Sequence, residues 1–120
     1  MPPRLAAAFA LVALGKTESS EFAPLTYLVN SLNSRGYRGV AQAYLGELAR
    51  TPAGNQAVRS ALHAFLKRAT KEEKLGILRV LAASGDRESL PHLEALTKDT
   101  DTDVAQEAIR AVRTLRARLP

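Results

Sequence analysis

Apolar residues recur every three or four positions along almost the whole chain, with polar residues between them. This spacing places the apolar side chains on one face of a helix, whereas a half-buried strand would alternate strictly. No segment shows a convincing alternation of the strand type. The pattern therefore predicts an all-α fold of about seven helices. They are expected at about 3–14, 20–33, 37–50, 55–69, 71–83, 87–98 and 102–118.

Short polar turns with recognisable start and stop residues separate the predicted helices. Thr70 and Glu73 have the spacing of a capping box, in which each side chain accepts a hydrogen bond from the other's backbone. Gly85 is expected to end the fifth helix, Asp86 to cap the sixth, and Asp101 or Thr102 to begin the seventh. Connections this short favour antiparallel neighbours.

Two parts of the chain resemble each other. Pro24 and Pro91, 67 residues apart, each mark the early turns of a predicted helix, the second and the sixth. Val-Ala-Gln occurs at 40–42 and again at 104–106, each time at the start of the following helix. The repeated unit is then a helix pair of about 31–37 residues. A single domain over 1–120 is predicted, with repeats at about 3–34, 37–69 and 71–98 and a final half-repeat at 102–118.

The clearest repeat lies in the second half of the chain. Residues 78–86 read Leu-Arg-Val-Leu-Ala-Ala-Ser-Gly-Asp, an apolar helix followed by a Gly-Asp turn. The next helix contains Pro91, with leucines at a spacing of three around it, and an acidic turn precedes Val104. This succession resembles a HEAT-like repeat.

The resemblance is good over 72–115, weaker over 5–50, and rests mainly on periodicity over 51–70. The Arg that often follows the Val in that family is replaced here by Ala41 and Ala105. The resemblance implies a right-handed α–α superhelix, a HEAT-like solenoid of antiparallel helix pairs. It also implies that the second helix of each pair lines the inner, concave face.

Composition limits the kinds of functional site that the chain can form. The chain of 120 residues is 46% apolar and 24% charged, as expected of one globular domain. It contains no cysteine, which excludes disulfides, a thiol nucleophile and a thiolate metal site. No stretch approaches the roughly 20 apolar residues of a membrane span, so no membrane association is expected.

Charge is banded along the sequence, within a net charge of +5. Residues 35–71 contain seven basic residues and only Glu47 as an acid, giving +6. Residues 72–107 contain nine acids and four bases, giving −5, and residues 108–120 contain four arginines and no acid. A basic segment permits contact with nucleic acid phosphates, but the acidic band and the absence of Trp count against it.

The N-terminus permits two interpretations. A short basic start followed by the apolar run 5–14 resembles a signal peptide, with Ala13-Leu14-Gly15 as a cleavage site. Alternatively the segment is an amphipathic first helix, with Leu5, Phe9 and Val12 on one face. The repeat pattern favours the helix. A cytoplasmic location is therefore predicted, with export as the alternative if residues 1–15 act as a signal.

Three features suggest chemistry but lack essential parts. Asp99, Asp101 and Asp103 have the spacing of a calcium loop, whose sixth and twelfth positions should be Gly and Glu but are Val104 and Arg110. Helix capping accounts for these acids more simply.

The other two features are a phosphate-loop fragment and the histidines. Gly15-Lys16-Thr17 resembles the end of a phosphate-binding loop without the earlier glycine or the preceding strand. His63 and His92 lie on different predicted helices, and neither has a ligand partner one turn away. No catalytic residue, metal or cofactor is therefore expected.

The remaining candidates are residues for partner binding. Arg59, His63 and Lys67 follow one another at i+4 spacing on the face of the fourth helix opposite its apolar stripe. On the inner curve implied by the resemblance they would be joined by Tyr27 and Asn30. His92 of the sixth helix completes the set of six. Such a charged face is commonly only solvated; otherwise it contributes to binding.

The function expected from these observations is a non-enzymatic protein–protein interaction module or scaffold that binds a partner segment on its concave face. The first alternative is sequence-nonspecific binding of a nucleic acid backbone through the basic segment 35–71. The second is an accessory HEAT-like domain or subunit of a larger enzyme, as in certain peptidases and bilin lyases. End-to-end self-association is a further expectation, through an exposed apolar surface at 5–12 or on the last helix.

Overall fold

The computed structural model describes residues 3–13, 24–50 and 55–119, and these residues form seven α-helices and one short 3₁₀ helix without any strand. The all-α prediction is therefore confirmed. The elements are α1 (Pro3–Ala13), α2 (Pro24–Asn30), η1 (Ser31–Asn33), α3 (Arg38–Arg50), α4 (Asn55–Phe65), α5 (Lys71–Ser84), α6 (Ser89–Leu96) and α7 (Thr102–Arg118).

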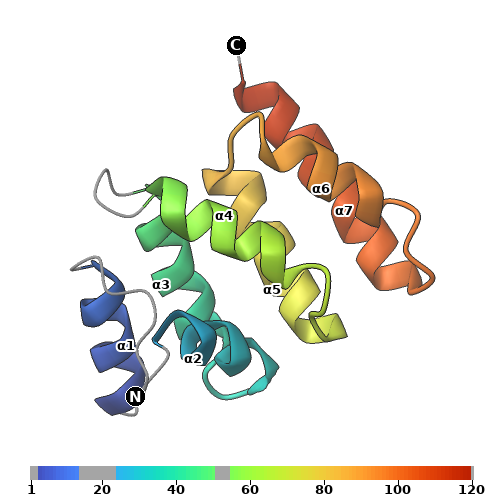
Figure 1. Cartoon of the computed structure of the whole chain (residues 1–120). Coiled ribbons are helices and arrows are strands. Elements are labelled where there is room, and N and C mark those ends of the chain that lie inside the picture. The colour runs from blue at the N-terminus through green and yellow to red at the C-terminus, as the bar shows by residue number, and fades with distance from the viewer. Residues whose placement is uncertain (1–2, 14–23, 51–54, 120) are drawn as a thin grey trace.

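Contacts between the helices define two rows. In the odd row α1 packs against α3, α3 against α5 and α5 against α7. In the even row α2 rests on α1 and α3, α4 rests on α3 and contacts α6, and α6 packs against α7. Figure 1 shows α1 and α7 at opposite ends of the molecule. The odd helices have 11 to 17 residues and the even ones only 7 to 11, so the odd row provides most of the stacking contact.

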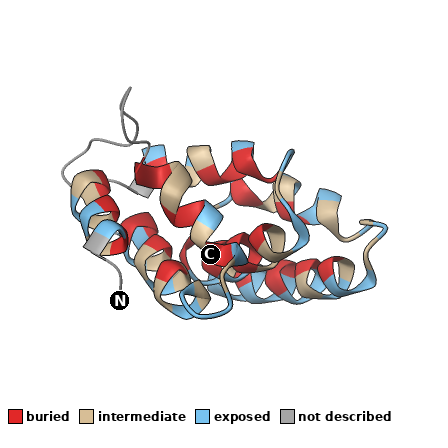
Figure 2. Cartoon of the chain, turned by 90° about the horizontal axis from the view of Figure 1, so that it is seen from below, coloured by how far each residue is buried: buried red, intermediate tan, exposed pale blue. Residues whose placement is uncertain are grey.

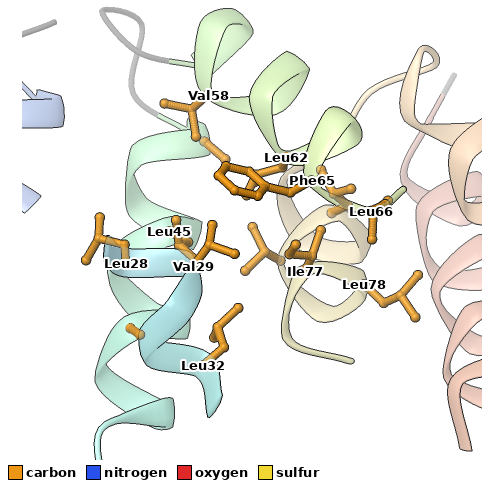
Figure 3. Packing of buried hydrophobic residues seen from close by; sticks show 14 of the residues in the cluster. Leu28, Val29, Leu32, Leu45, Val58, Leu62, Phe65, Leu66, Ile77 and Leu78 are labelled. Carbon is orange, nitrogen blue, oxygen red and sulfur yellow. The ribbon is translucent and has the colours of Figure 1, made fainter. Parts of the chain in front are cut away.

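One hydrophobic cluster joins all seven helices, from Leu5 of α1 to Leu115 of α7. α5 lies at its centre, because it contacts both α3 and α7. Figure 3 shows the side chains of Leu62 and Phe65 pointing from α4 towards Ile77 of α5. Figure 2 shows the buried residues on the inward sides of the helices. The radius of gyration is 13.4 Å, close to the roughly 13.6 Å expected of a folded chain of this length.

Two predicted helix starts are confirmed. At α5, Thr70 Oγ1 accepts a hydrogen bond from the backbone N–H of Glu73, and Glu73 Oε1 accepts one from the backbone N–H of Thr70. At α7, Asp101 Oδ1 accepts from the backbone N–H groups of Asp103 and Val104, at 2.9 and 3.2 Å. These bonds satisfy donors that a helix leaves unpaired in its first turn.

Gly85 ends α5, as predicted, and this position has no room for a side chain. Its φ of −78° is open to any residue, but a Cβ here would lie 2.5 Å from the carbonyl oxygen of Leu81 and 2.8 Å from Ser89 Oγ. The next turn brings α6 back close to the end of α5. α6 begins only at Ser89, two residues later than expected, and the residue before it is Glu88, so the prediction that Asp86 caps this helix is wrong. Asp86 Oδ1 instead accepts a hydrogen bond from the backbone N–H of Glu88 in the turn, at 3.1 Å.

The two prolines occupy comparable positions, the first residue of α2 and the third of α6, where proline is tolerated. Over the described part of the second predicted helix, the α-helix ends at Asn30 and continues as η1. Ser31 Oγ donates to the carbonyl of Tyr27, and Asn33 Nδ2 donates to the carbonyl of Asn30. Side chains that bond nearby carbonyls compete with the regular α-helical pattern.

The two ends of the odd row differ from each other. In α1, Leu5, Ala8 and Val12 are buried, which confirms the amphipathic helix over the described part of that segment. In α7, Ile109 falls within the apolar spacing of the helix, but it is 46% exposed. The inward side of α7 already packs on α5 and α6, and Ile109 lies off that side. None of the described helices has the length and apolarity that a membrane crossing requires.

Candidate functional site

The side chains of His63 and His92 meet where α4 contacts α6. Their rings are stacked, with centroids 4.3 Å apart and planes inclined by 16°. They are the only two histidines of the chain and lie 29 residues apart in sequence. The packing of α4 on α6 therefore brings two residues into contact that were expected on the same concave face but not against each other.

His63 is buried, with 7% of its surface exposed, and its Nε2 lies 2.8 Å from Ser89 Oγ. Burial is the largest cause that lowers the pKa of His63, followed by the charge of His92 and, more weakly, that of Arg59. Asp86 acts in the opposite direction. The environment thus favours a neutral imidazole, since a buried cation would lose its hydration.

Arg59 lies one turn before His63 and ties three segments together. Its Nη2 is 3.0 Å from Asp86 Oδ2, and its Nη1 donates to the carbonyl of Ala49 at 3.1 Å. Only 14% of its side chain is exposed. A largely buried guanidinium with both a carboxylate and a carbonyl partner acts as a structural link between α3, α4 and the turn before α6.

Ser89 and His63 have the contact expected of a nucleophile and a base, but they lack access to a substrate. Ser89 has no exposed surface. The nearby carboxylate of Asp86 pairs with Arg59 and lies 3.4 Å from Ser89 Oγ. A triad instead needs a carboxylate that orients the histidine and a hydroxyl that reaches the substrate. This cluster joins α4 to the first turn of α6.

A groove of about 260 Å³ opens on the solvent side of the histidine stack. It runs between α4 and α6, and its lining is mainly apolar. The exposed ammonium-bearing side chain of Lys67 lies at its rim. The groove is lined by His63, Leu66, Lys67, Pro91, His92, Ala95 and Leu96.

A second groove, of about 250 Å³, lies on the other side of α4, between α4 and α2. The guanidinium of Arg68 is 4.9 Å from the centre of the Phe65 ring, a cation–π arrangement. The lining residues are Leu25, Thr26, Ala57, Ala61, Ala64, Phe65 and Arg68. α4 therefore separates two shallow grooves, and each groove has one basic residue from the turn that follows that helix, Lys67 or Arg68.

The basic face expected on α4 is only partly exposed. His63 faces α6 and is buried, so the prediction that it lies opposite the apolar side is wrong. Arg59 also points into the structure and is held by Asp86. Lys67 is exposed, as expected. The error arises because α4 is covered on two sides, by the core and by α6, whereas one apolar stripe indicates one covered side.

The predicted residues of α2 do not reach these grooves. Asn30 is exposed and its carbonyl accepts from Asn33 Nδ2. Tyr27 packs against the core. Of the six predicted binding residues, the structure gathers His63, Lys67 and His92 around one groove. That these three contact a partner stays a prediction.

Folding pairs part of the basic segment with the acidic segment. Cations of the basic segment 35–71 pair with carboxylates of the acidic segment 72–107 at 2.8 to 3.4 Å. These pairs are Arg38–Glu72, Arg59–Asp86, Lys71–Asp101 and Lys71–Asp103. Within the described ranges, Arg35, Lys67 and Arg68 are the cations of that segment outside any ion pair.

The acidic turn before α7 binds lysines and a helix end. Lys74 Nζ lies 3.0 Å from Asp99 Oδ2. The backbone N–H of Asp101 is the largest cause that lowers the pKa of Asp99, followed by the hydrogen bond from Lys74. Among the described residues, no group of three or more His, Asp or Glu side chains has an arrangement that would hold a metal ion. Residues 15–17, with the phosphate-loop resemblance, lie outside the described residues.

Sequence reasoning missed several residues of the site. Asp86 stands before the predicted helix 87–98, where its position indicates only capping, and Ser89 lies inside that helix without a predicted role. Pro91 and Ala95 lie within the predicted helix 87–98, and nothing in the sequence pattern indicates a groove beside them. The missing information is which side of α6 faces α4.

Comparisons with known proteins supply no family for this chain. No family model, curated protein or solved structure matches it. The function is therefore argued from the geometry of the two grooves and the charges beside them.

Proposed function

We propose that this chain is a short HEAT-like solenoid that acts as a non-enzymatic protein–protein interaction module. Its docking surface is the row of even helices α2, α4 and α6. The observation that carries the proposal is the pair of grooves on either side of α4, of about 250 and 260 Å³. Long odd helices that stack on one another, with shorter helices on one side, agree with a repeat architecture of this kind.

The lining of the grooves defines the chemistry of the partner. Small apolar residues such as Ala61, Ala64 and Ala95 leave room for apolar side chains from a partner segment. Lys67 and Arg68, adjacent at the end of α4, carry positive charge with no carboxylate partner in the described part of the chain. A protein segment with apolar residues followed by Asp or Glu is the complement of this surface.

Binding is favoured over catalysis because the polar side chains near the grooves are enclosed or already hydrogen-bonded. Ser89 is enclosed, and His63 is committed to a stack and a hydrogen bond. The open parts of the grooves are apolar or carry a single charge. An accessory domain of a larger enzyme would use the same surface, with the enzyme as its partner.

Ion pairing favours a protein partner over a nucleic acid. Arg38, Arg59 and Lys71 are neutralised by carboxylates, so the basic segment does not present a continuous cationic track. Binding to phosphates depends on several free cations and weakens steeply with salt. Binding to apolar grooves is expected to change little between low and moderate salt.

The test is a screen of a displayed random peptide library against the full chain, followed by titration of the selected peptides. We expect a consensus of apolar residues with adjacent Asp or Glu. The double variant Lys67→Glu, Arg68→Glu should lower the affinity by about tenfold or more, because it reverses the charge beside both grooves.

Arg35→Glu is the matched control. Arg35 is exposed, has no ion pair in the described structure, and lies in the turn before α3, outside both grooves. Its reversal should change the affinity less than about twofold. A consensus without acidic residues, or an equal effect of the control and the double variant, would contradict the proposal.

A further inference from the structure

The free side of α7 exposes a large aliphatic side chain. Ile109 is 46% exposed, and within the described ranges only Tyr37, at 43%, is a comparably exposed large apolar residue. Leaving about half of an isoleucine exposed forgoes part of the free energy that its burial would contribute. A single such residue is common on protein surfaces. Ile109 differs from the common case because it lies in a groove.

Ile109 lies in a groove of about 490 Å³ between the end of α6 and α7. Val112 forms the buried part of its apolar floor. In the described part of the chain no other helix contributes to its lining. We name this region the end surface; its residues are Thr97, Ile109, Val112, Arg113 and Arg116.

Arginines border the end surface. Residues 108–120 contain four arginines and no acid. Arg116 Nη2 contacts Glu94 Oε1 at 2.7 Å, which holds its guanidinium beside the groove. Arg113 is exposed and makes no ion pair with a described carboxylate. Arg113 therefore supplies the free positive charge beside the apolar floor, and Arg116 shares its charge with Glu94.

The spacing along α7 matches a helical partner. Positions 109, 112, 113 and 116 share one side of the helix, because they are three, four and seven residues apart. From 109 to 116 this side extends about 10.5 Å, or two helical turns. A partner helix with apolar residues at the same spacing would cover the floor and place its flanking side chains at Arg113 and Arg116.

We propose that the end surface binds an acidic amphipathic helix of a partner protein, separately from the grooves beside α4. Leucine-like side chains would cover Ile109 and Val112, and carboxylates would pair with Arg113 and Arg116. A second copy in a two-fold contact centred on Arg113 would bring the two Arg113 side chains together, and these would repel each other. A nucleic acid backbone would leave Ile109 uncovered, since phosphates offer no apolar surface.

The probe is a synthetic 14-residue helical peptide with Leu at positions i, i+3, i+4 and i+7 and Glu beside them. The control peptide has the same leucines with Lys in place of Glu. Isothermal titration on the full chain should show binding of the Glu peptide only. Ile109→Asp and Arg113→Glu should each weaken that binding by about tenfold or more.

Matched variants separate this surface from its neighbours. Arg110→Glu changes the same charge on the same helix, but Arg110 lines the α5–α7 side, so the affinity should stay within about twofold. The double variant Lys67→Glu, Arg68→Glu should also leave it unchanged, whatever its effect beside α4. Circular dichroism verifies that each variant remains folded.

Three results would overturn the proposal. The first is equal binding of the Glu and Lys peptides. The second is loss of binding in the Lys67→Glu, Arg68→Glu variant while Arg113→Glu binds normally. The third is a dimer in light scattering that Ile109→Asp abolishes, which would assign the end surface to a second copy of the chain.

Discussion

The contact between α5 and α7 and the contact between α4 and α6 use different interactions. In the odd row, buried leucines are flanked by ion pairs, with Lys74 on Asp99 and Arg79 on Glu107 at 3.0 and 2.9 Å. In the even row, two stacked imidazoles and a hydroxyl form the contact, and a groove remains beside them.

This difference indicates a division of roles. The odd row resembles an ordinary protein interior, where apolar burial dominates the free energy of folding. The even row combines a buried histidine, His63, with open apolar space beside it. Substitutions in the odd row should therefore act mainly on stability, and those in the even row on pH dependence and binding.

The largest effect is expected from Leu78→Ala in the odd row. Leu78 is fully buried and lies on the side of α5 towards α7 (Figure 3). Removing a buried leucine side chain costs about 2–5 kcal/mol, because apolar burial is lost and a cavity remains. Urea unfolding of the full chain measures the change.

Leu66→Ala is the even-row counterpart. Leu66 is 5% exposed and lines the groove beside α6, so water can reach the space that it leaves. We expect a smaller loss than for Leu78→Ala. Equal losses would show that the two rows do not differ in the way proposed.

The next largest effect is expected at the turn that sets α6 against α5. In Gly85→Ala the new Cβ would meet the Leu81 carbonyl oxygen at 2.5 Å, and backbone cannot easily move. A loss of about 1–3 kcal/mol is expected. Gly46→Ala in α3 is the control, since nothing lies within 4 Å of its Cβ position. It should stabilise the chain by about 0.5–1 kcal/mol.

A smaller effect concerns pH. Because the pKa of His63 is lowered in the folded chain, the unfolded chain binds the proton more readily. The free energy of unfolding should reach its highest value above about pH 6.5. It should fall as the pH drops below that value. His63→Gln should flatten this dependence between pH 7 and 5. An unchanged slope in urea titrations would remove His63 as its cause.

The smallest effect is expected from the exposed ion pair of the odd row. Arg79→Met keeps the aliphatic packing of the side chain and removes its charge beside Glu107. The arginine is 43% exposed, so a loss of about 0.2–1 kcal/mol is expected. Thermal unfolding in low and high salt provides the measurement, and the difference between the proteins should shrink in high salt.

The sequence by itself determined the helices and their ends. Apolar spacing located each helix within a few residues, because helix geometry imposes that period on any buried face. Thr70, Glu73 and Asp101 identified two helix starts through hydrogen bonds between near neighbours in sequence. Gly85 identified a helix end. All these features depend on residues close together in the chain.

Only the tertiary structure decided which distant residues meet. The stacking of His63 on His92, the pairing of Arg59 with Asp86 and the exposure of Ile109 all depend on how one helix lies on another. Periodicity indicates that a helix has a buried side. It does not specify which element packs on that side, or how many sides of the helix are covered. That information resides in contacts between elements, which arise when the two rows pack.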